Sequence, residues 1–214
     1  TMVANKIPYE LIYVIAGTDN TMSLLNELEK KLPIISFYTE RPEGLGNAFK
    51  KGFSAVSDDC SYVLTMDADL NHQPEDIPRF LLEMQKNNPD VIIGSRYIEN
   101  AVSVNIAWWK SLVSKLANIV FDMLTKVHVK DKTSGYRLYK REVIKEIYPL
   151  ITSRNFEFLM EILLIAAARK YEMREVPITF IYRIHGKSKM SLLKTARGYA
   201  KLLMYSLLGR YLLN

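Results

Sequence analysis

Apolar and polar positions along the chain follow two patterns, short β-prone runs and longer stretches with helical spacing. The β-prone runs predict strands at residues 10–15, 34–38, 62–66, 90–95 and 175–182, and a short strand at the end of 131–139. Apolar residues spaced three or four apart predict helices at residues 22–31, 44–56, 75–87, 104–125, 142–147, 157–169 and 191–213. Strands and helices in alternation favour an α/β fold, with a sheet covered by helices.

One predicted strand runs directly into a pair of acids. Residues 62–74 read Y-V-L-T-M-D-A-D-L-N-H-Q-P, so Asp67 and Asp69 follow the apolar run. Carboxylates two positions apart at the end of a strand share a side and can converge on a divalent cation. Ligands of open α/β sheets bind outside the carboxyl ends of the strands. The pair indicates a metal site for a nucleotide diphosphate, and an acidic turn capping a helix that starts at Pro74 is the simpler alternative.

Two further segments place glycine or arginine where a phosphate could bind. Residues 41–52 read R-P-E-G-L-G-N-A-F-K-K-G, and Gly44 and Gly46 would let the backbone approach an anion at a helix start. An ordinary loop leading into a helix would explain the same residues. Arg96 follows the strand at residues 90–95, where it could contact phosphate or form a salt bridge that orients the aspartates.

Charged side chains also occur inside apolar elements. Residues 131–139 read D-K-T-S-G-Y-R-L-Y, with Arg137 in the apolar part. An unpaired buried charge is costly, so Arg137 requires an acidic or a phosphate partner. Glu157 and Glu161 share one face of a strongly apolar helix. They either line a polar cleft or form ion pairs with Arg137 or Arg154.

The positive charge is concentrated at the C-terminus. The chain has a net charge of +6, and seven Lys and Arg residues but no acid follow Val176. Residues 183–190 read R-I-H-G-K-S-K-M, which suits a phosphate clamp or a solvated basic loop. The helix at 191–213 has an apolar and a basic face, typical either of a helix on an anionic membrane or of one docked on the core. Nucleic-acid binding is disfavoured, because no binding motif is present and few aromatics accompany the basic residues.

Length and composition narrow the class of protein. The 214 residues suffice for one domain with a substantial core. The single cysteine, Cys60, excludes a disulfide framework and a thiolate zinc site. No apolar run reaches the roughly 18 residues of a membrane span, and no signal peptide is visible at the N-terminus.

Five motifs occur in a definite order: M-D-A-D-L-N-H-Q-P, G-S-R-Y, T-S-G-Y-R-L-Y, F-E-F-L-M-E-I and R-I-H-G-K-S-K-M. Together they closely resemble family 2 glycosyltransferases of the dolichol-phosphate mannosyltransferase type, from about Tyr9 to about Leu193. The resemblance implies a GT-A-type nucleotide-diphospho-sugar transferase fold, an α/β fold of three layers with a mostly parallel sheet. It also implies a catalytic domain at residues 1–190 and a C-terminal amphipathic basic helix at residues 191–214.

The resemblance assigns roles to individual residues. Asp67 and Asp69 match the D-x-D pair that holds Mg²⁺ or Mn²⁺ on the donor diphosphate. Arg137 and the basic segment match positions around the donor diphosphate and the acceptor phosphate, and two glutamates match acids on the sugar and acceptor side. The expected catalytic residues are Asp69, Arg137, Glu157 and Glu161. The expected substrate-binding residues are Asp19, Gly44, Gly46, Asp67, Arg96, Ser134, Arg183, Lys187, Ser188 and Lys189.

The implied function is inverting, metal-dependent transfer of a hexose, mannose or glucose, to a polyprenyl or dolichyl phosphate. The implied donor is GDP-mannose or UDP-glucose. Such a protein would be cytoplasmic and peripherally associated with the cytoplasmic face of a membrane through its C-terminal helix. Two alternatives remain: a related family 2 glycosyltransferase with another acceptor, and a non-catalytic homologue that binds a membrane or a protein partner.

The chain departs from the family's pattern near its N-terminus. The family opens with a strand that ends in P-x-Y-N-E, and this motif does not occur here. Where the family has D-D-G-S, Ala16 and Gly17 replace the usual acids, and Asp19 is the nearest carboxylate. Without that first strand, neighbouring strands would have unpaired backbone groups. We therefore expect an N-terminal truncation, a replacement strand from another segment, or a partner chain.

Overall fold

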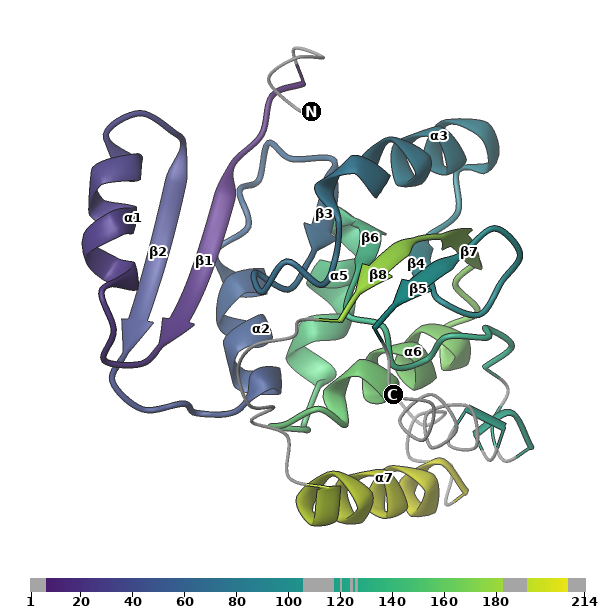
Figure 1. The fold of residues 1–214 in the computed structure, drawn as a ribbon. Coiled ribbons are helices and arrows are strands. Elements are labelled where there is room, and N and C mark those ends of the chain that lie inside the picture. The colour runs from purple at the N-terminus through teal and green to yellow at the C-terminus, as the bar shows by residue number, and fades with distance from the viewer. Residues whose placement is uncertain are drawn as a thin grey trace.

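The computed structural model describes residues 7–105, 118–119, 121–123, 125, 127–182 and 192–207. The strands of the main sheet are β3 (Tyr62–Thr65), β4 (Val91–Ser95), β6 (Arg137–Lys140) and β7 (Met173–Pro177). They lie in the order β3-β6-β4-β7 (Figure 1). β6 is antiparallel to both of its neighbours, whereas β4 and β7 are parallel. The main sheet is therefore mixed.

Helices cover both faces of the main sheet. α3 (Ile77–Asn87), which follows a 3₁₀ turn at Pro74–Asp76, packs on one face. α5 (Arg141–Ile147), its 3₁₀ continuation at Tyr148–Leu150, and α6 (Phe158–Ala168) cover the other. Because successive side chains of a strand point to opposite faces, Ile92 joins the apolar cluster of α3 and Ile93 joins that of α5 and α6. These are the three layers expected from the sequence.

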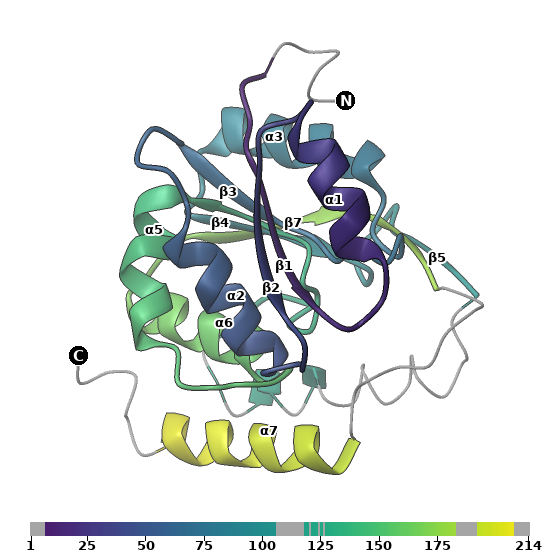
Figure 2. The ribbon, with the colours of Figure 1, turned by 90° about the vertical axis from the view of Figure 1, so that its left-hand side faces the viewer.

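The N-terminal strands form a sheet of their own. β1 (Leu11–Ala16) and β2 (Ile34–Thr39) are parallel and pair only with each other within the described part of the chain. They run steeply across the direction of the main sheet (Figure 2). The remaining elements here are α1 (Thr21–Glu29) and α2 (Leu45–Ser54). Among the described residues, no strand joins β1 to the main sheet. The expectation that another segment or a partner chain fills this place stays a prediction.

The C-terminal strand expected at residues 175–182 is in fact two strands in different sheets. Main-sheet strand β7 ends at Pro177, and β8 (Thr179–Ile181) pairs with β5 (Val102–Val104), a strand that the sequence pattern did not predict. Where the chain passes from one sheet to the other, the buried carboxylate of Asp76 accepts a hydrogen bond from the Thr179 amide over 2.6 Å. Val104 therefore ends a strand instead of starting a helix, and most of the helix predicted at 104–125 lies outside the described residues.

The C-terminal helix α7 (Leu192–Leu207) is docked on the core. Leu202 is 2% exposed, and Tyr199 and Leu203 pack against the apolar cluster on the α6 side of the sheet. Arg197 and Lys201 are exposed on the outside. Of the two alternatives for this helix, docking accounts for its apolar face, and its basic face points outward. No helix among the described residues is long and apolar enough to cross a membrane.

Candidate functional site

Strand pairing brings two of the sequence motifs together. β3 and β6 are antiparallel, with Thr65 opposite Arg137. The Thr65 hydroxyl donates a hydrogen bond to the Gly135 carbonyl over 2.7 Å. A methyl group added to Gly135 would lie 3.6 Å from a carboxylate oxygen of Asp67. The turn after β3 that contains Asp67 and Asp69, called the aspartate turn below, therefore forms one site with the loop that leads into β6.

The aspartate turn is held by its own side chains. The amide and the side-chain nitrogen of Asn71 donate hydrogen bonds to the Asp69 carboxylate over 3.1 and 2.8 Å. Leu70, between them, has a φ of +62°, in the left-handed region that Leu rarely adopts. Such strain persists where surrounding contacts enforce it, and it is frequent at functional sites.

The buried ring of His72 binds the backbone of the same turn. The ring is 2% exposed and packs between the rings of Tyr136 and Phe180, at centroid distances of 5.0 and 5.4 Å. Its Nδ1 accepts a hydrogen bond from the Asp67 amide over 3.2 Å. Burial, and next the charge of Arg96, lower the pKa of His72 to about 4. The ring is thus neutral near pH 7, as an Nδ1 acceptor must be.

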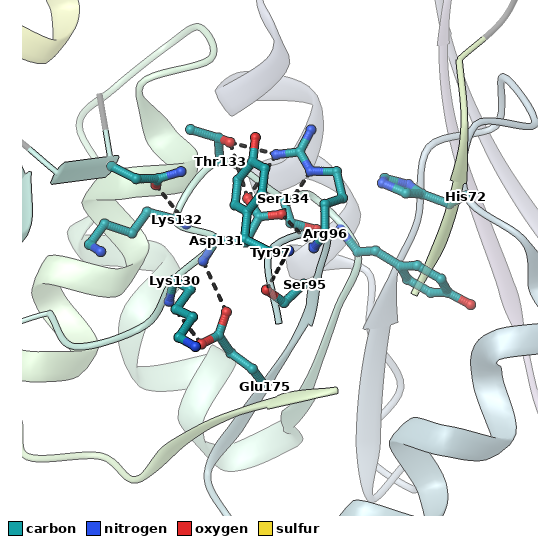
Figure 3. Close-up of polar contacts among 12 residues, drawn as sticks. His72, Ser95, Arg96, Tyr97, Lys130, Asp131, Lys132, Thr133, Ser134 and Glu175 are labelled. Atoms are coloured by element: carbon teal, nitrogen blue, oxygen red, sulfur yellow. Dashed lines mark hydrogen bonds and ion pairs between the residues drawn. The ribbon is translucent and has the colours of Figure 1, made fainter. Parts of the chain in front are cut away.

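Arg96 forms a buried, bidentate ion pair with Asp131 (Figure 3). Its Nε and Nη2 each donate to a carboxylate oxygen of Asp131 over 2.7 Å, and its backbone amide donates over 3.0 Å. Burial opposes ionisation of Asp131, but the guanidinium holds the pKa of that carboxyl below its usual range. A salt bridge was one of the two alternatives for Arg96. Its partner is Asp131, where the sequence analysis expected the aspartates of the D-x-D pair.

The loop before β6 is held in place by hydrogen bonds and an ion pair that the sequence did not reveal. The Glu175 carboxylate accepts hydrogen bonds from the amides of Lys130 and Asp131 over 2.8 and 2.9 Å (Figure 3). The Lys132 side chain is fully buried, and its ammonium group contacts Asp122 and the Val129 carbonyl. The sequence offered no signal for this burial, because a lysine beside an acid in a polar loop normally faces solvent.

Arg137 is fully buried beneath this loop. Its Nη2 donates to the Lys132 carbonyl over 2.9 Å, whereas Nε and Nη1 have no hydrogen-bond partner among the residues that the structure describes. Buried donors are nearly always paired, so two open donors on one guanidinium require an explanation. An anionic group could accept a hydrogen bond from either donor. The Nε–H and Nη1–H bonds point to different sides of the guanidinium, so each requires an acceptor oxygen of its own.

The two helical glutamates have different surroundings. Glu161 is fully buried and accepts hydrogen bonds from the Thr152 amide and hydroxyl and from the Ser153 amide, at 2.7 to 3.1 Å. These contacts hold the segment that precedes α6. Glu157 is 9% exposed, and its Oε1 accepts a bond from the Asn155 amide over 3.3 Å. Its Oε2 lacks a partner within the described ranges, so Glu157 retains an acceptor for a ligand.

The two glycines before α2 contact the same segment. The Gly46 amide donates to the Arg154 carbonyl over 2.9 Å, and a methyl group on Gly46 would overlap the Ser153 carbonyl. Gly44 has a φ of +101°, and a methyl group there would overlap the Arg154 carbonyl. Close packing against residues 153–154 thus accounts for both glycines. Their predicted ligand contact stays a prediction.

Two other predicted residues have local hydrogen-bond partners, and the rest lie outside the described part. The Asp19 carboxylate accepts the Thr21 amide over 3.1 Å at the start of α1. The buried Ser134 hydroxyl oxygen accepts the Tyr136 amide over 3.3 Å. The remaining predicted residues lie outside the described residues: Arg183, Lys187, Ser188 and Lys189.

The donor set at the aspartate turn fits a divalent cation that also binds a substrate. Asp67 and Asp69 supply carboxylate oxygens, which Mg²⁺ and Mn²⁺ prefer. In the described ranges, no group of three or more His, Cys, Asp and Glu side chains could hold a metal ion. An ion on this pair would therefore draw its other ligands from water and phosphate oxygens, as Mg²⁺ usually does.

Comparison with known proteins gives two kinds of relative. Residues 3–148 match the model of glycosyl transferase family 2. The chain is 37% identical over 187 residues to the dolichol-phosphate mannosyltransferase of Pyrococcus furiosus, a match covering 85% of this chain and 51% of that protein. It is 35% identical over 177 residues to polyprenol monophosphomannose synthase of Mycolicibacterium smegmatis, covering 81% of this chain and 66% of that protein. The chain thus spans about half of the first relative and just under two thirds of the second.

Among solved structures, the chain is similar to glucosyl-3-phosphoglycerate synthase from Mycobacterium tuberculosis. The TM-score is 0.60 for its complex with phosphoglyceric acid and for its complex with Mn²⁺, uridine-diphosphate and glucosyl-3-phosphoglycerate. In both, the identity is 19%, and the match covers 95% of this chain and 69% of that chain. The likeness confirms the GT-A-type α/β fold expected from the sequence.

Proposed function

Because the chain belongs to glycosyltransferase family 2, we propose that it transfers a hexose from a nucleotide-diphosphate sugar to a polyprenyl or dolichyl phosphate. The names of the two curated relatives favour mannose over glucose as the sugar. The donor would be GDP-mannose for mannose and UDP-glucose for glucose. The observation that carries the proposal is the pairing of β3 with β6. This pairing brings the aspartate turn next to the loop that leads to Arg137. The buried guanidinium of Arg137 has two N–H donors without a partner among the described residues.

Each charged side chain at the site has a use in this reaction. Asp67 and Asp69 would hold Mg²⁺ or Mn²⁺, which when bound supplies positive charge against the donor diphosphate. Arg137 would donate from Nε and Nη1 to phosphate oxygens, and Glu157 Oε2 would accept a hydrogen bond from a sugar hydroxyl. The Arg96 side chain is already paired with Asp131, so its role would be to hold the loop before β6 in place.

The chemical step is a single displacement with inversion. The acceptor phosphate oxygen is already an anion near neutral pH, so no strong general base is needed. It attacks the anomeric carbon from the side opposite the leaving diphosphate. The new carbon–oxygen bond forms as the bond to the diphosphate breaks, and the electron pair leaves on the diphosphate oxygen. The protein contributes by positioning both phosphates and by neutralising their charge.

The acceptor lipid would reach the site from a membrane surface. The docked α7 exposes Arg197 and Lys201 on its outer side, and residues 183–190 carry further basic residues just before it. Each basic residue near an anionic membrane adds about 1 kcal/mol of attraction. These features support peripheral association of the protein with the membrane.

We also propose that a strand from outside the described residues, in a preceding segment or a partner chain, lies between β1 and β3. β1 reads L-I-Y-V-I-A, yet all six residues are only partly buried, whereas central strands of such sheets are buried on both faces. Tyr62 at the start of β3 and Met66 directly after its end are 45% and 38% exposed. The strand would carry the missing part of the nucleotide site. Fast hydrogen exchange is expected in this chain for the alternate β1 amides that do not bond to β2, and slow exchange of those amides would contradict it.

Calorimetric titration with GDP-mannose and with UDP-glucose, each with and without Mn²⁺, tests the proposed function. We expect metal-dependent binding of one donor and transfer to a short-chain polyprenyl phosphate. Asp69→Ala should abolish both while leaving the fold intact by circular dichroism. Asp59→Asn, at an exposed acid near the start of β3, should change neither. A folded protein that binds neither donor would point instead to a non-catalytic homologue.

A further inference from the structure

The aspartate turn is attached to β8, a strand of a different sheet. His72 forms an isolated antiparallel bridge with Phe180, and the Asn71 carbonyl accepts a hydrogen bond from the Ile181 amide over 3.0 Å. Both partners belong to β8, which pairs with β5 and not with the main sheet. β8 therefore holds the backbone directly after the two acids of the turn.

The turn requires such support because its backbone is strained. Leu70, directly after Asp69, has a left-handed φ of +62°. Its side chain is 78% exposed, so packing of that side chain cannot enforce the conformation. Strained backbone persists only where the surrounding structure determines it. The contacts that flank Leu70 therefore keep the turn in this shape.

His72 adds a contact that reaches the first acid of the turn. Its Nδ1 accepts the Asp67 amide over 3.2 Å. The ring is 2% exposed and is enclosed by the rings of Tyr136 and Phe180. A ring packed in this way has little room to turn, so its acceptor stays directed at the Asp67 backbone. The Asp67 carboxylate itself lies beside Gly135, as described above.

We propose that His72 is a positioning residue for the metal site, because its bond to the Asp67 amide holds the Asp67 carboxylate where it can share a divalent cation with Asp69. The inference rests on the proposed function, since it takes these two aspartates as the groups that hold Mg²⁺ or Mn²⁺. His72 acts only through the backbone of Asp67 and touches neither the ion nor the substrate. Groups that orient a metal ligand typically contribute roughly 10- to 100-fold to metal affinity.

His72→Leu and His72→Asn separate this positioning from packing. Leu fills apolar space between the two rings but accepts no hydrogen bond, whereas the side-chain oxygen of Asn can take the place of Nδ1. The Mn²⁺ dissociation constant is measured from the electron paramagnetic resonance signal of the free ion, with GDP-mannose and with UDP-glucose present in turn. We expect Mn²⁺ binding to weaken about tenfold in His72→Leu, and His72→Asn to restore most of the loss.

Ile144→Ala is the control for lost stability. Ile144 is fully buried in the apolar cluster of α5 and α6, on the face of the main sheet opposite Tyr136. This variant should unfold at a lower temperature and keep the wild-type dissociation constant for Mn²⁺. Equal constants in wild type and His72→Leu would overturn the assignment of His72. A loss in His72→Asn as large as that in His72→Leu would overturn it as well.

Hydrogen exchange of the Asp67 amide in the metal-free wild type decides the question if His72→Leu does not fold. The bond to Nδ1 should make this amide exchange slowly, and fast exchange would refute the positioning role. A wild type that binds neither donor in the presence of Mn²⁺ defeats the proposed function and this inference with it. A wild type with metal-dependent donor binding that His72→Leu leaves unchanged defeats this inference alone.

Discussion

Arg96 and Asp131, 35 positions apart in the sequence, are joined by two side-chain hydrogen bonds of 2.7 Å in the interior of the protein. The Asp131 side chain is fully buried and that of Arg96 is 15% exposed. The pair ties the end of β4 to the loop that carries Ser134 and Gly135. Since Gly135 lies beside Asp67, the pair indirectly supports one side of the aspartate turn.

Asp131→Asn should destabilise the protein by about 3–5 kcal/mol, because it leaves the buried Arg96 charge without its partner. The pKa of Asp131 is lower in the folded than in the unfolded chain. Its contribution is therefore present above the unfolded value of about 3.9 and is lost as pH falls further. Urea unfolding between pH 2 and 7 should show a shallower acid loss in Asp131→Asn. Identical curves for variant and wild type would contradict the pairing.

His72 should also make the stability of the protein depend on pH, in a higher pH range than Asp131 does. Its folded pKa of about 4 lies below the unfolded value of about 6.5, so the unfolded chain binds the proton more readily. The contribution is complete above pH 6.5 and is lost as pH falls towards 4, by about 3 kcal/mol.

His72→Asn, which keeps an acceptor near the Asp67 amide, should remove most of that pH dependence in metal-free buffer. His128→Asn is the matched control at an exposed histidine and should retain it. Thermal unfolding at half-unit steps of pH would measure both. A wild-type stability that is flat from pH 6.5 to 4 would refute the neutral, buried state of His72.

Sequence patterns predicted what depends on local periodicity and order along the chain. The apolar run at residues 62–66, the acids that follow it and the amphipathic helix at 157–169 all exist in the structure with ends shifted by a few residues at most. These features depend on neighbours in the sequence, so an apolar pattern is enough to find them.

Features that depend on distant partners were not predictable in this way. The apolar run at 175–182 gave no sign that it would divide between two sheets, or that Asp76, about a hundred positions earlier, would bind the Thr179 amide there. Arg96 and Lys132 carry charges whose partners are chosen by the packing of separate loops. The aspartates of the D-x-D turn were the obvious acids for Arg96, but β4 brings Asp131 closer to it.

Arg137→Met should abolish the transfer activity and leave the stability of the protein nearly unchanged. Removing a buried guanidinium with two open donors should keep the free energy of unfolding within about 1 kcal/mol of wild type, although the Lys132 carbonyl loses a bond. Transfer to polyprenyl phosphate should nevertheless be lost, because no other described side chain offers two open buried donors at this site.

Urea unfolding and a transfer assay on the same preparation would make that comparison. Arg174→Met, at an exposed arginine of β7, serves as the control and should leave transfer intact. A strong loss of stability in Arg137→Met would show instead that Arg137 is structural, with its donors satisfied in the folded protein.

The two glutamates of α6 should respond in opposite ways to the same substitution. Glu161→Gln replaces a carboxylate that accepts several hydrogen bonds with an amide whose NH₂ faces donors, so it should cost about 3 kcal/mol of stability. Glu157→Gln alters a carboxylate with one long bond and an oxygen that lacks a partner among the described residues, and should change stability little. Its effect should fall on kcat, because the open oxygen is the one available to substrate. Chemical denaturation and steady-state rates on both variants would separate the roles, and a Glu161→Gln protein as stable as wild type would remove the basis for dividing them.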